Sequence, residues 1–234
     1  MSWISRAIAV ALACSLVAAG PTLAVVNEFS AGEVIAGSPI YNGIRGNQGI
    51  RTDPATVSGV SYVHIVQADL GASGGDFYAI GTTNGAGTNG GPTQNCPDSY
   101  TAKWSIYTDG VNGGIYFCKV QQVDSLSAFT SPAFSLSFGT CNSHGLWIFS
   151  FNGTQWECRG GSSSAAIVVD AGIEVVSSNG VDRNIDALYT NMQTRLTGST
   201  TWSSMGTVTS VVFPNYSFLQ TSPTTFAAYL APLD

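Results

Sequence analysis

The sequence predicts an all-β protein, an antiparallel β-sandwich of jelly-roll type with one short amphipathic helix. Short segments alternate apolar and polar residues with period two, turn residues separate these segments, and charged residues make up only 9% of the chain. So many strands must bury their apolar faces by packing sheet on sheet. No internal repeat or change in composition divides the chain, so residues 25–234 are expected to form a single domain.

Residues 1–24 have the pattern of a secretory signal peptide. One cation, Arg6, precedes the apolar run AIAVALACSLVAAG, and the small-residue ending TLA stops at Ala24. The run is shorter than the ~20 apolar residues that a membrane span needs. We therefore expect cleavage after Ala24 and a secreted mature chain without a membrane span.

The strands are expected to follow one another with short turns. AFSLSF is the clearest, because Phe134, Leu136 and Phe138 fall on one face. Asn152 and Gly153 separate two such runs, which is the strongest short hairpin signal because both turn positions need positive φ. In chain order the expected strand segments are 41–50, 61–70, 76–83, the hairpin 103–120, 133–138, the hairpin 146–158, 165–176, 202–213 and 224–231.

One segment, residues 181–198, has a different period. Ile185, Leu188, Met192 and Leu196 recur at helical spacing, and Gly198 follows as a stop. The spacing predicts the single amphipathic helix.

Four cysteines follow the signal peptide, and an even number in an exported chain predicts two disulfides. Of the three connectivities, we expect Cys96 with Cys118 and Cys141 with Cys158, because each bond closes a loop of about twenty residues, which is worth about 3 kcal/mol. A zinc site is the alternative.

The composition disfavours several classes of ligand. No C-x-x-C spacing occurs, and only His64 and His144 could complete a zinc site, so neither a metal nor another cofactor is predicted. The formal net charge is −6 and the chain has no basic patch, which argues against nucleic acid as a partner. The oligomeric state stays open.

Candidate chemistry begins with two acids on one strand. Asp170 and Glu174 share a face opposite a continuous apolar face, but four residues of strand separate them by about 13 Å. That distance is too long for the paired carboxylates of a glycosidase. No G-x-S-x-G motif indicates a serine hydrolase either. Glu174 remains a candidate, with two readings: a ligand contact, or a solvated outward carboxylate.

Aromatic residues offer a second candidate site. Trp104 and Tyr107 fall on opposite faces of their strand by parity, so one of them is expected to point away from the sandwich interior. An outward aromatic ring on a sheet face can hold a sugar ring. Core packing is the alternative for each ring.

The segments YVHIVQ, DFYAIG, YTAKWSIYTDG and AGIEVV resemble, in this order, the secreted glutamic peptidases (eqolisins) and exported bacterial proteins similar to them. The resemblance implies a concanavalin-like β-sandwich. In those peptidases a strand ending Q-x-G supplies the catalytic glutamine, an aromatic strand Y-x-A-x-x-x-x-Y-x-D follows, and a later Ala-Glu strand supplies the acid. The aromatic pattern is matched here by Tyr100, Ala102, Tyr107 and Asp109.

The match to the catalytic pair is incomplete. Glu174 stands in the position of the acid, whereas Ala79 stands where the glutamine should be. The mechanism that the resemblance implies needs the amide to stabilise an oxyanion, and losing one such donor costs about 3 kcal/mol. Gln67 lies in the neighbouring strand and is expected on a different sheet face from the positions of the catalytic pair.

Three functions are therefore open. The leading hypothesis is a secreted, non-catalytic sandwich that binds an extracellular ligand such as a glycan. The alternatives are a peptidase-like hydrolase with Glu174 as its catalytic acid, and a structural or surface protein without a small-molecule site. The ligand-binding residues under the leading hypothesis are Tyr100, Trp104, Tyr107, Asp109 and Glu174.

Overall fold

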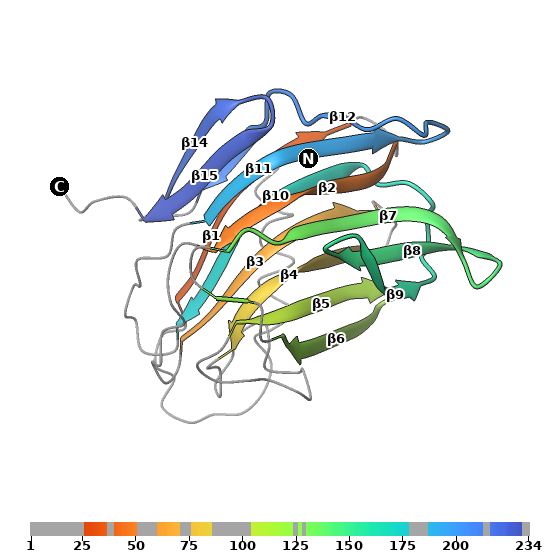
Figure 1. Cartoon of the computed structure of the whole chain (residues 1–234), viewed down its shortest axis with the longest axis horizontal. Helices are drawn as coiled ribbons and strands as arrows, with labels where there is room; N and C mark the ends of the chain where they lie inside the picture. The colour runs from red at the N-terminus through yellow and green to blue at the C-terminus, as the bar shows by residue number, and fades with distance from the viewer. Residues whose placement is uncertain are drawn as a thin grey trace.

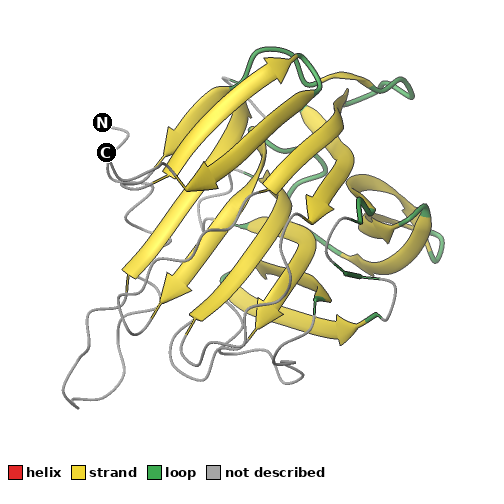
Figure 2. Cartoon of the chain, turned by 60° about the vertical axis from the view of Figure 1, so that its left-hand side comes forward, coloured by secondary structure: helices red, strands yellow, loops and turns green. Residues whose placement is uncertain are grey.

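A computed structural model describes residues 26–36, 40–50, 60–70, 76–85, 104–123, 126–127, 130–177, 187–212 and 216–230. These residues form two antiparallel sheets that pack against each other (Figures 1 and 2). The predicted all-β sandwich is confirmed. The predicted signal peptide, residues 1–24, lies outside the described residues.

The first sheet has seven strands in the order β13-β1-β10-β3-β4-β5-β6. Every pairing in it is antiparallel. Strand β10 occurs late in the chain but lies between β1 and β3. The strands are β1 (Val26–Ile35), β3 (Val60–Asp69), β4 (Phe77–Gly85), β5 (Ser105–Asn112), β6 (Ile115–Gln122), β10 (Val168–Ser177) and β13 (Thr209–Val212).

The second sheet has eight strands. Seven follow the order β14-β15-β11-β2-β7-β8-β9, and the two-residue strand β12 pairs with β11 (Figure 1). The strands are β2 (Tyr41–Ile50), β7 (Ala133–Cys141), β8 (His144–Phe151), β9 (Thr154–Arg159), β11 (Ala187–Leu196), β12 (Ser203–Ser204), β14 (Tyr216–Ser222) and β15 (Thr225–Leu230).

The main hydrophobic core lies between the sheets. Alternate residues of each strand enter it, as the period-two pattern predicts: Val169 and Ile80 come from the first sheet, and Leu136 and Phe149 from the second, all fully buried. Trp104 belongs to the same cluster. The other alternate residues therefore point away from the main core on both sheets.

The covalent and turn predictions agree with the structure where it describes them. Asn152 and Gly153 have φ values of 48° and 78° and join β8 to β9. Cys141 and Cys158 form a disulfide with a Cα–Cα distance of 6.6 Å. Cys118 is also disulfide-bonded, whereas its expected partner Cys96 lies outside the described residues.

The predicted helix is wrong, because residues 187–196 form strand β11. Ala187 and Tyr189 point into the core, but a β-bulge between Thr190 and Gln193 then shifts the inward positions, so that Met192 is buried. Of the residues whose spacing predicted the helix, Met192 is buried, whereas Leu188 lies between the two inward residues and Leu196 is 49% exposed. The helical spacing therefore combined inward and outward positions of a strand. The described residues contain no helix, and therefore none that could cross a membrane.

Candidate functional site

The candidate site lies on the face of the seven-stranded sheet that points away from the main core. Strand register places Glu33, Asp170, Gln67, Ala79 and Asp109 side by side on five neighbouring strands. Directly opposed residues on antiparallel strands have Cβ atoms about 5 Å apart. We call these five residues the outer row; it brings three carboxyl groups and one amide together on one surface.

Asp170 is the most deeply buried acid of the outer row, with 3% of its surface exposed. Its Oδ1 atom has no hydrogen-bond partner. Burial raises the pKa of Asp170 well above its ordinary value, and the nearby carboxylates of Glu33 and Asp69 raise it further. Burial and Asp69 also raise the pKa of Glu33. Asp170 therefore holds its proton at a pH at which an exposed aspartate has lost it.

Gln67 lies directly opposite both Asp170 and Ala79. The expectation that it would occupy a different face is wrong. Within β3 the inward positions are Val66 and Ala68, both buried in the main core, so Gln67 must point outward. Gln67 is half-buried. Its side-chain amide makes no hydrogen bond among the described residues, which leaves it able to donate to another group.

A second, smaller hydrophobic cluster lies on the same face and contains Ala79, Tyr107 and Val120. The hydroxyl of Tyr116 donates to Oδ2 of Asp109 at 3.3 Å. Burial raises the pKa of Tyr107 well above its ordinary value, and hydrogen bonds with Asp109 and Tyr116 contribute to the same shift. Asp109 therefore joins the buried Tyr107 and the exposed Tyr116 in one network at this end of the outer row.

The predicted ligand-binding residues do not form one surface. Trp104 is 2% exposed and packs in the main core, whereas Tyr107 is 1% exposed on the opposite face of the sheet. Asp109 is 8% exposed beside Tyr107. Tyr100 lies outside the described residues. The backbone of Glu174 pairs with Phe29 and Val63, and its side chain is not described.

Asp170 is visible in the sequence, but its distance from Glu174 on the same strand excluded the two acids as a catalytic pair. The neighbours that matter, Glu33 and Gln67, come from β1 and β3. Among the described residues, no group of three or more His, Cys, Asp and Glu side chains is arranged to hold a metal ion. The outer row itself brings together carboxyl and amide groups, which can form hydrogen bonds.

The sequence matches no protein-family model and no curated protein. Solved structures with a similar fold do exist. Scytalido-glutamic peptidase with a transition state analog inhibitor superposes with a TM-score of 0.56 and 11% identity, over 89% of this chain and 100% of that chain. The same peptidase with a peptide-based analog gives a TM-score of 0.52 and 9% identity over the same shares. SCP-B, a member of the Eqolisin family solved with a tripeptide, gives 0.48 and 11%, again over 89% and 100%.

The two superpositions with scytalido-glutamic peptidase confirm, at the level of the fold, the resemblance to the glutamic peptidases. The chain therefore shares the concanavalin-like sandwich that the resemblance implied.

Proposed function

We propose that the protein is a hydrolase of amide bonds in which Asp170 transfers the proton and Gln67 stabilises the oxyanion. One observation carries the proposal: a buried carboxyl group with an unpartnered oxygen lies directly opposite an unengaged amide. Strongly shifted acids in such surroundings are common at catalytic sites. The fold adds support, because the similar peptidase was solved with an inhibitor that mimics a transition state.

The reaction needs only groups that the outer row supplies. The Asp170 carboxylate accepts a proton from a water molecule while the water oxygen attacks the carbonyl carbon of the substrate. The side-chain N–H of Gln67 donates to the carbonyl oxygen as it becomes negative. Protonated Asp170 then gives its proton to the leaving nitrogen, the C–N bond breaks, and an acid and an amine are released with the Asp170 carboxylate restored.

This assignment replaces Glu174 with Asp170 as the catalytic acid and Ala79 with Gln67 as the amide donor. Asp170 and Glu174 are both on β10, four residues apart, and the strand register gives them different neighbours. Only Asp170 has Gln67 as its direct partner, because Glu174 pairs with Val63. Ala79, which stands beside Gln67, leaves space where a larger side chain would crowd the amide.

The non-catalytic glycan hypothesis has less support at this face. A sugar platform needs an exposed aromatic ring, and both Trp104 and Tyr107 are buried. Tyr100 and Glu174 stay predicted ligand contacts. We also infer that the protein works outside the cytoplasm, because the disulfide between Cys141 and Cys158 requires an oxidising compartment.

The test is hydrolysis of a mixed peptide library between about pH 3 and about pH 7, a range that begins below the ordinary pKa of an aspartate side chain. We expect Asp170→Asn to lower kcat/KM at least about a hundredfold and Gln67→Leu to lower it by about the same factor. Glu174→Gln is the matched control on the same strand and should retain activity within a few-fold.

The pH profile gives a second readout. Because the carboxylate form of Asp170 accepts the proton, kcat/KM should rise with pH through the raised pKa of Asp170 rather than through the ordinary aspartate value. Full activity of Asp170→Asn would overturn the proposal. So would loss of activity in Glu174→Gln alone, or the absence of any cleavage by the wild-type protein.

A further inference from the structure

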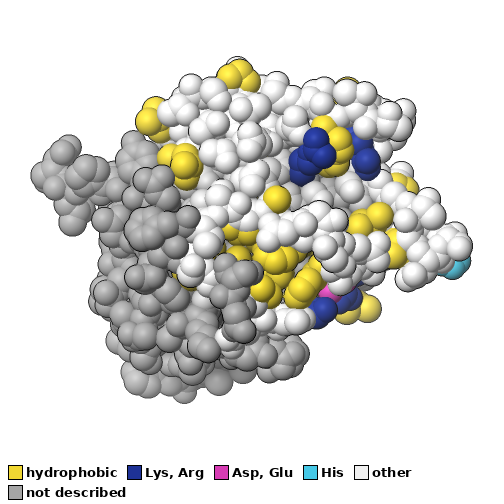
Figure 3. Space-filling view, in the orientation of Figure 1, with side chains coloured by type: hydrophobic (Ala, Val, Ile, Leu, Met, Phe, Trp, Pro, Cys, Tyr) yellow, Lys and Arg dark blue, Asp and Glu magenta, His cyan; other side chains and the backbone are white. Residues whose placement is uncertain are grey.

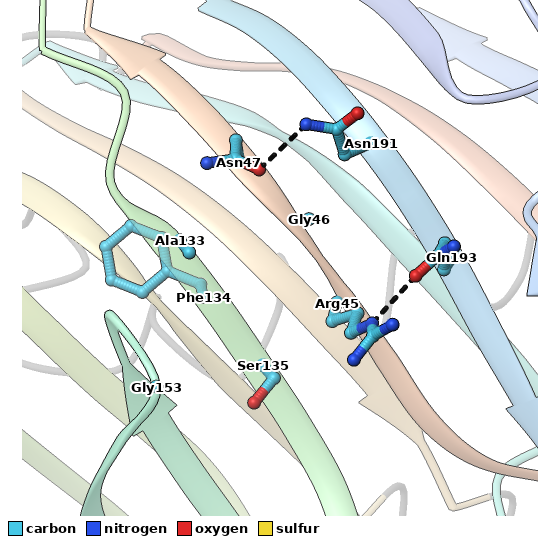
Figure 4. A pocket seen from close by; sticks show the side chains of 9 residues that line it. All are labelled: Arg45, Gly46, Asn47, Ala133, Phe134, Ser135, Gly153, Asn191 and Gln193. Carbon is cyan, nitrogen blue, oxygen red and sulfur yellow. Dashed lines mark hydrogen bonds between the residues drawn. The ribbon is translucent and has the colours of Figure 1, made fainter. Parts of the chain in front are cut away.

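A pocket of about 330 Å³ lies on the eight-stranded sheet, on the outer face of β11, β2 and β7 (Figure 4). This volume is at the lower end of the range of small-molecule sites, which suits a ligand of one or two rings. The pocket is separate from the outer row, because that row belongs to the other sheet. Its polar lining residues are Arg45, Asn47, Ser135, Asn191 and Gln193; we call these five the arginine pocket.

Strand register assembles the arginine pocket. Arg45 lies directly opposite Gln193 on one side and Ser135 on the other. Asn191 occupies the β-bulge with a φ of 56°, a left-handed conformation that asparagine tolerates better than most residues. The bulge turns its side chain toward Asn47, to which its Nδ2 donates at 3.2 Å (Figure 4).

Most of the hydrogen-bonding capacity left in the pocket belongs to donors. Arg45 Nε donates to Gln193 Oε1 at 2.8 Å, and Asn47 Nδ2 donates to the carbonyl oxygen of Ser131 at 3.1 Å. Among the described residues, the two terminal nitrogens of Arg45 and the amide nitrogen of Gln193 have no acceptor. A ligand that fills this pocket should therefore bring acceptors, and preferably an anion.

The positive charge of this face is not compensated. In the described part of the chain both ion pairs involve Glu157, and neither includes Arg45 or Arg195. Dark-blue basic side chains flank a yellow hydrophobic side chain in Figure 3, with no acidic side chain beside them. Burial lowers the pKa of Arg195, and the nearby charge of Arg45 lowers it further. An anion between or beside these cations would relieve their repulsion.

Trp202 holds the two arginines in place. The guanidinium carbon of Arg45 lies 4.4 Å from the centre of the Trp202 ring, and that of Arg195 lies 5.1 Å from it. Arg195 is further anchored by hydrogen bonds to Asn42 and to the carbonyl oxygen of Phe138. The planar guanidinium group of Arg45 is thus oriented by Trp202 but, unlike that of Arg195, remains exposed.

We propose that the arginine pocket binds a uronic-acid unit of an acidic glycan. The Arg45 fork matches the geometry of a carboxylate, which it can bind with two parallel hydrogen bonds. The Ser135 hydroxyl and the amide groups of Gln193 and Asn191 suit the hydroxyl groups of a sugar ring.

An acidic peptide fits this surface less well. Peptides commonly bind a sheet by adding a strand at its edge. The strands of the pocket, β11, β2 and β7, each have a hydrogen-bonded neighbour on both sides, so none offers a free edge. The lining also offers no exposed apolar side chain, since Phe134 is 1% exposed.

The test is calorimetric titration of the full chain with a galacturonic-acid trimer, a neutral galactose trimer and a glutamate trimer. We expect binding of the galacturonic-acid trimer alone, and weaker binding at about 500 mM than at about 50 mM salt. Arg45→Gln should weaken it at least about tenfold. Asn191→Ala is a second pocket variant and should weaken it several-fold. Lys119→Gln, which makes the same change in charge on β6, is the matched control and should change the affinity less than twofold.

The proposal is overturned if the galactose or glutamate trimer binds as tightly as the galacturonic-acid trimer, if Arg45→Gln and Lys119→Gln have the same effect, or if no binding is detected. The binding test does not depend on the proposed hydrolytic activity, and two variants separate the proposals. Asp170→Asn should leave the binding of the galacturonic-acid trimer intact, and Arg45→Gln should leave peptide cleavage intact.

Discussion

The outer faces of the two sheets differ in charge and in exposure. On the seven-stranded sheet, Glu33, Asp69 and Asp170 gather around one position, and Asp170 is almost fully buried. On the eight-stranded sheet, Arg45 and Arg195 both pack on the ring of Trp202, and Arg45 is exposed. The same alternating pattern of residues therefore produces a closed acidic surface on one sheet and an open basic surface on the other.

This difference indicates what each face can do. A buried carboxyl group without a partner lowers the stability of the folded state, and such groups are concentrated where proteins carry out chemistry. An exposed arginine costs little to maintain, because water solvates it, and it is ready for reversible binding. Three predictions test this comparison, from the largest expected effect to the smallest.

The largest effect on stability is expected at the closed face. Asp109→Ala removes the acceptor shared by Tyr107 and Tyr116 and leaves the hydroxyl of the buried Tyr107 without it, so the free energy of unfolding should fall by about 3 kcal/mol. Ser135→Ala on the open face should change it by less than about 0.5 kcal/mol. Urea denaturation measures both variants. Equal effects of the two substitutions would mean that polar side chains on the two outer faces contribute equally to the stability of the fold.

A smaller effect, with a defined pH dependence, is expected for Asp170→Asn. The folded-state pKa of Asp170 is raised, so between the ordinary aspartate value and the raised value the folded protein binds more protons than the unfolded chain. Wild-type stability should therefore fall as the pH rises through this window, and the raised pKa of Glu33 adds a change of the same sign. Asp170→Asn should be more stable than wild type at pH 7, by about 1 kcal/mol or more.

The advantage of Asp170→Asn should disappear below the ordinary aspartate pKa, where both proteins are neutral at position 170. Thermal or urea unfolding at several pH values measures the difference. A variant that is less stable than wild type at pH 7 would show that the carboxylate has a stabilising partner and would contradict the account of this face.

The third prediction concerns Gly43 on the open face, where the expected loss of stability is smaller than at Asp109 or Asp170. A Cβ atom at this position would lie 2.7 Å from Cη2 of Trp202, so Gly43→Ala must displace the indole ring. We expect a loss of about 1 kcal/mol or less, because a side chain can move where backbone cannot. The affinity for the galacturonic-acid trimer should fall a few-fold, since Trp202 orients Arg45.

Gly49→Ala is the matched control for Gly43→Ala. It lies on the same strand and face, and its Cβ would contact Leu188 rather than Trp202. Its affinity for the galacturonic-acid trimer should equal that of wild type. If both glycine variants lose affinity equally, the loss reflects distortion of β2 and not the position of Trp202.

Local patterns were enough to predict most of the fold. The alternation in AFSLSF and the Asn152-Gly153 pair each depend on residues close in sequence, and the structure confirms β7 and the β8–β9 turn. Strand β11 was mistaken for a helix because apolar Leu188 and Leu196 do not occupy its inward positions, and because its bulge interrupts the period of two. A bulge changes the inward positions within a strand, and a single sequence gives no sign of it other than the broken period.

Both candidate sites depend on register between strands that are distant in sequence. The alternation of side chains along β3 places Gln67 on the other face of the sheet from Val66. Only the pairing with β10 shows that Gln67 lies beside Asp170. Arg45 and Gln193 are 148 positions apart and belong to no motif. Patterns within one strand cannot specify such pairs, because a slip of one residue between strands reverses the face of every side chain.

The position of β10 between β1 and β3 also determines when the outer row can form during synthesis of the chain. The hairpins β3–β4 and β5–β6 join strands that are consecutive in sequence, whereas β10 must insert between two strands made much earlier. Asp170 follows Glu33 by 137 positions. A nascent chain therefore has Gln67 but lacks Asp170 beside it until most of the polypeptide has left the ribosome, which delays formation of the proposed site until the sheet is complete.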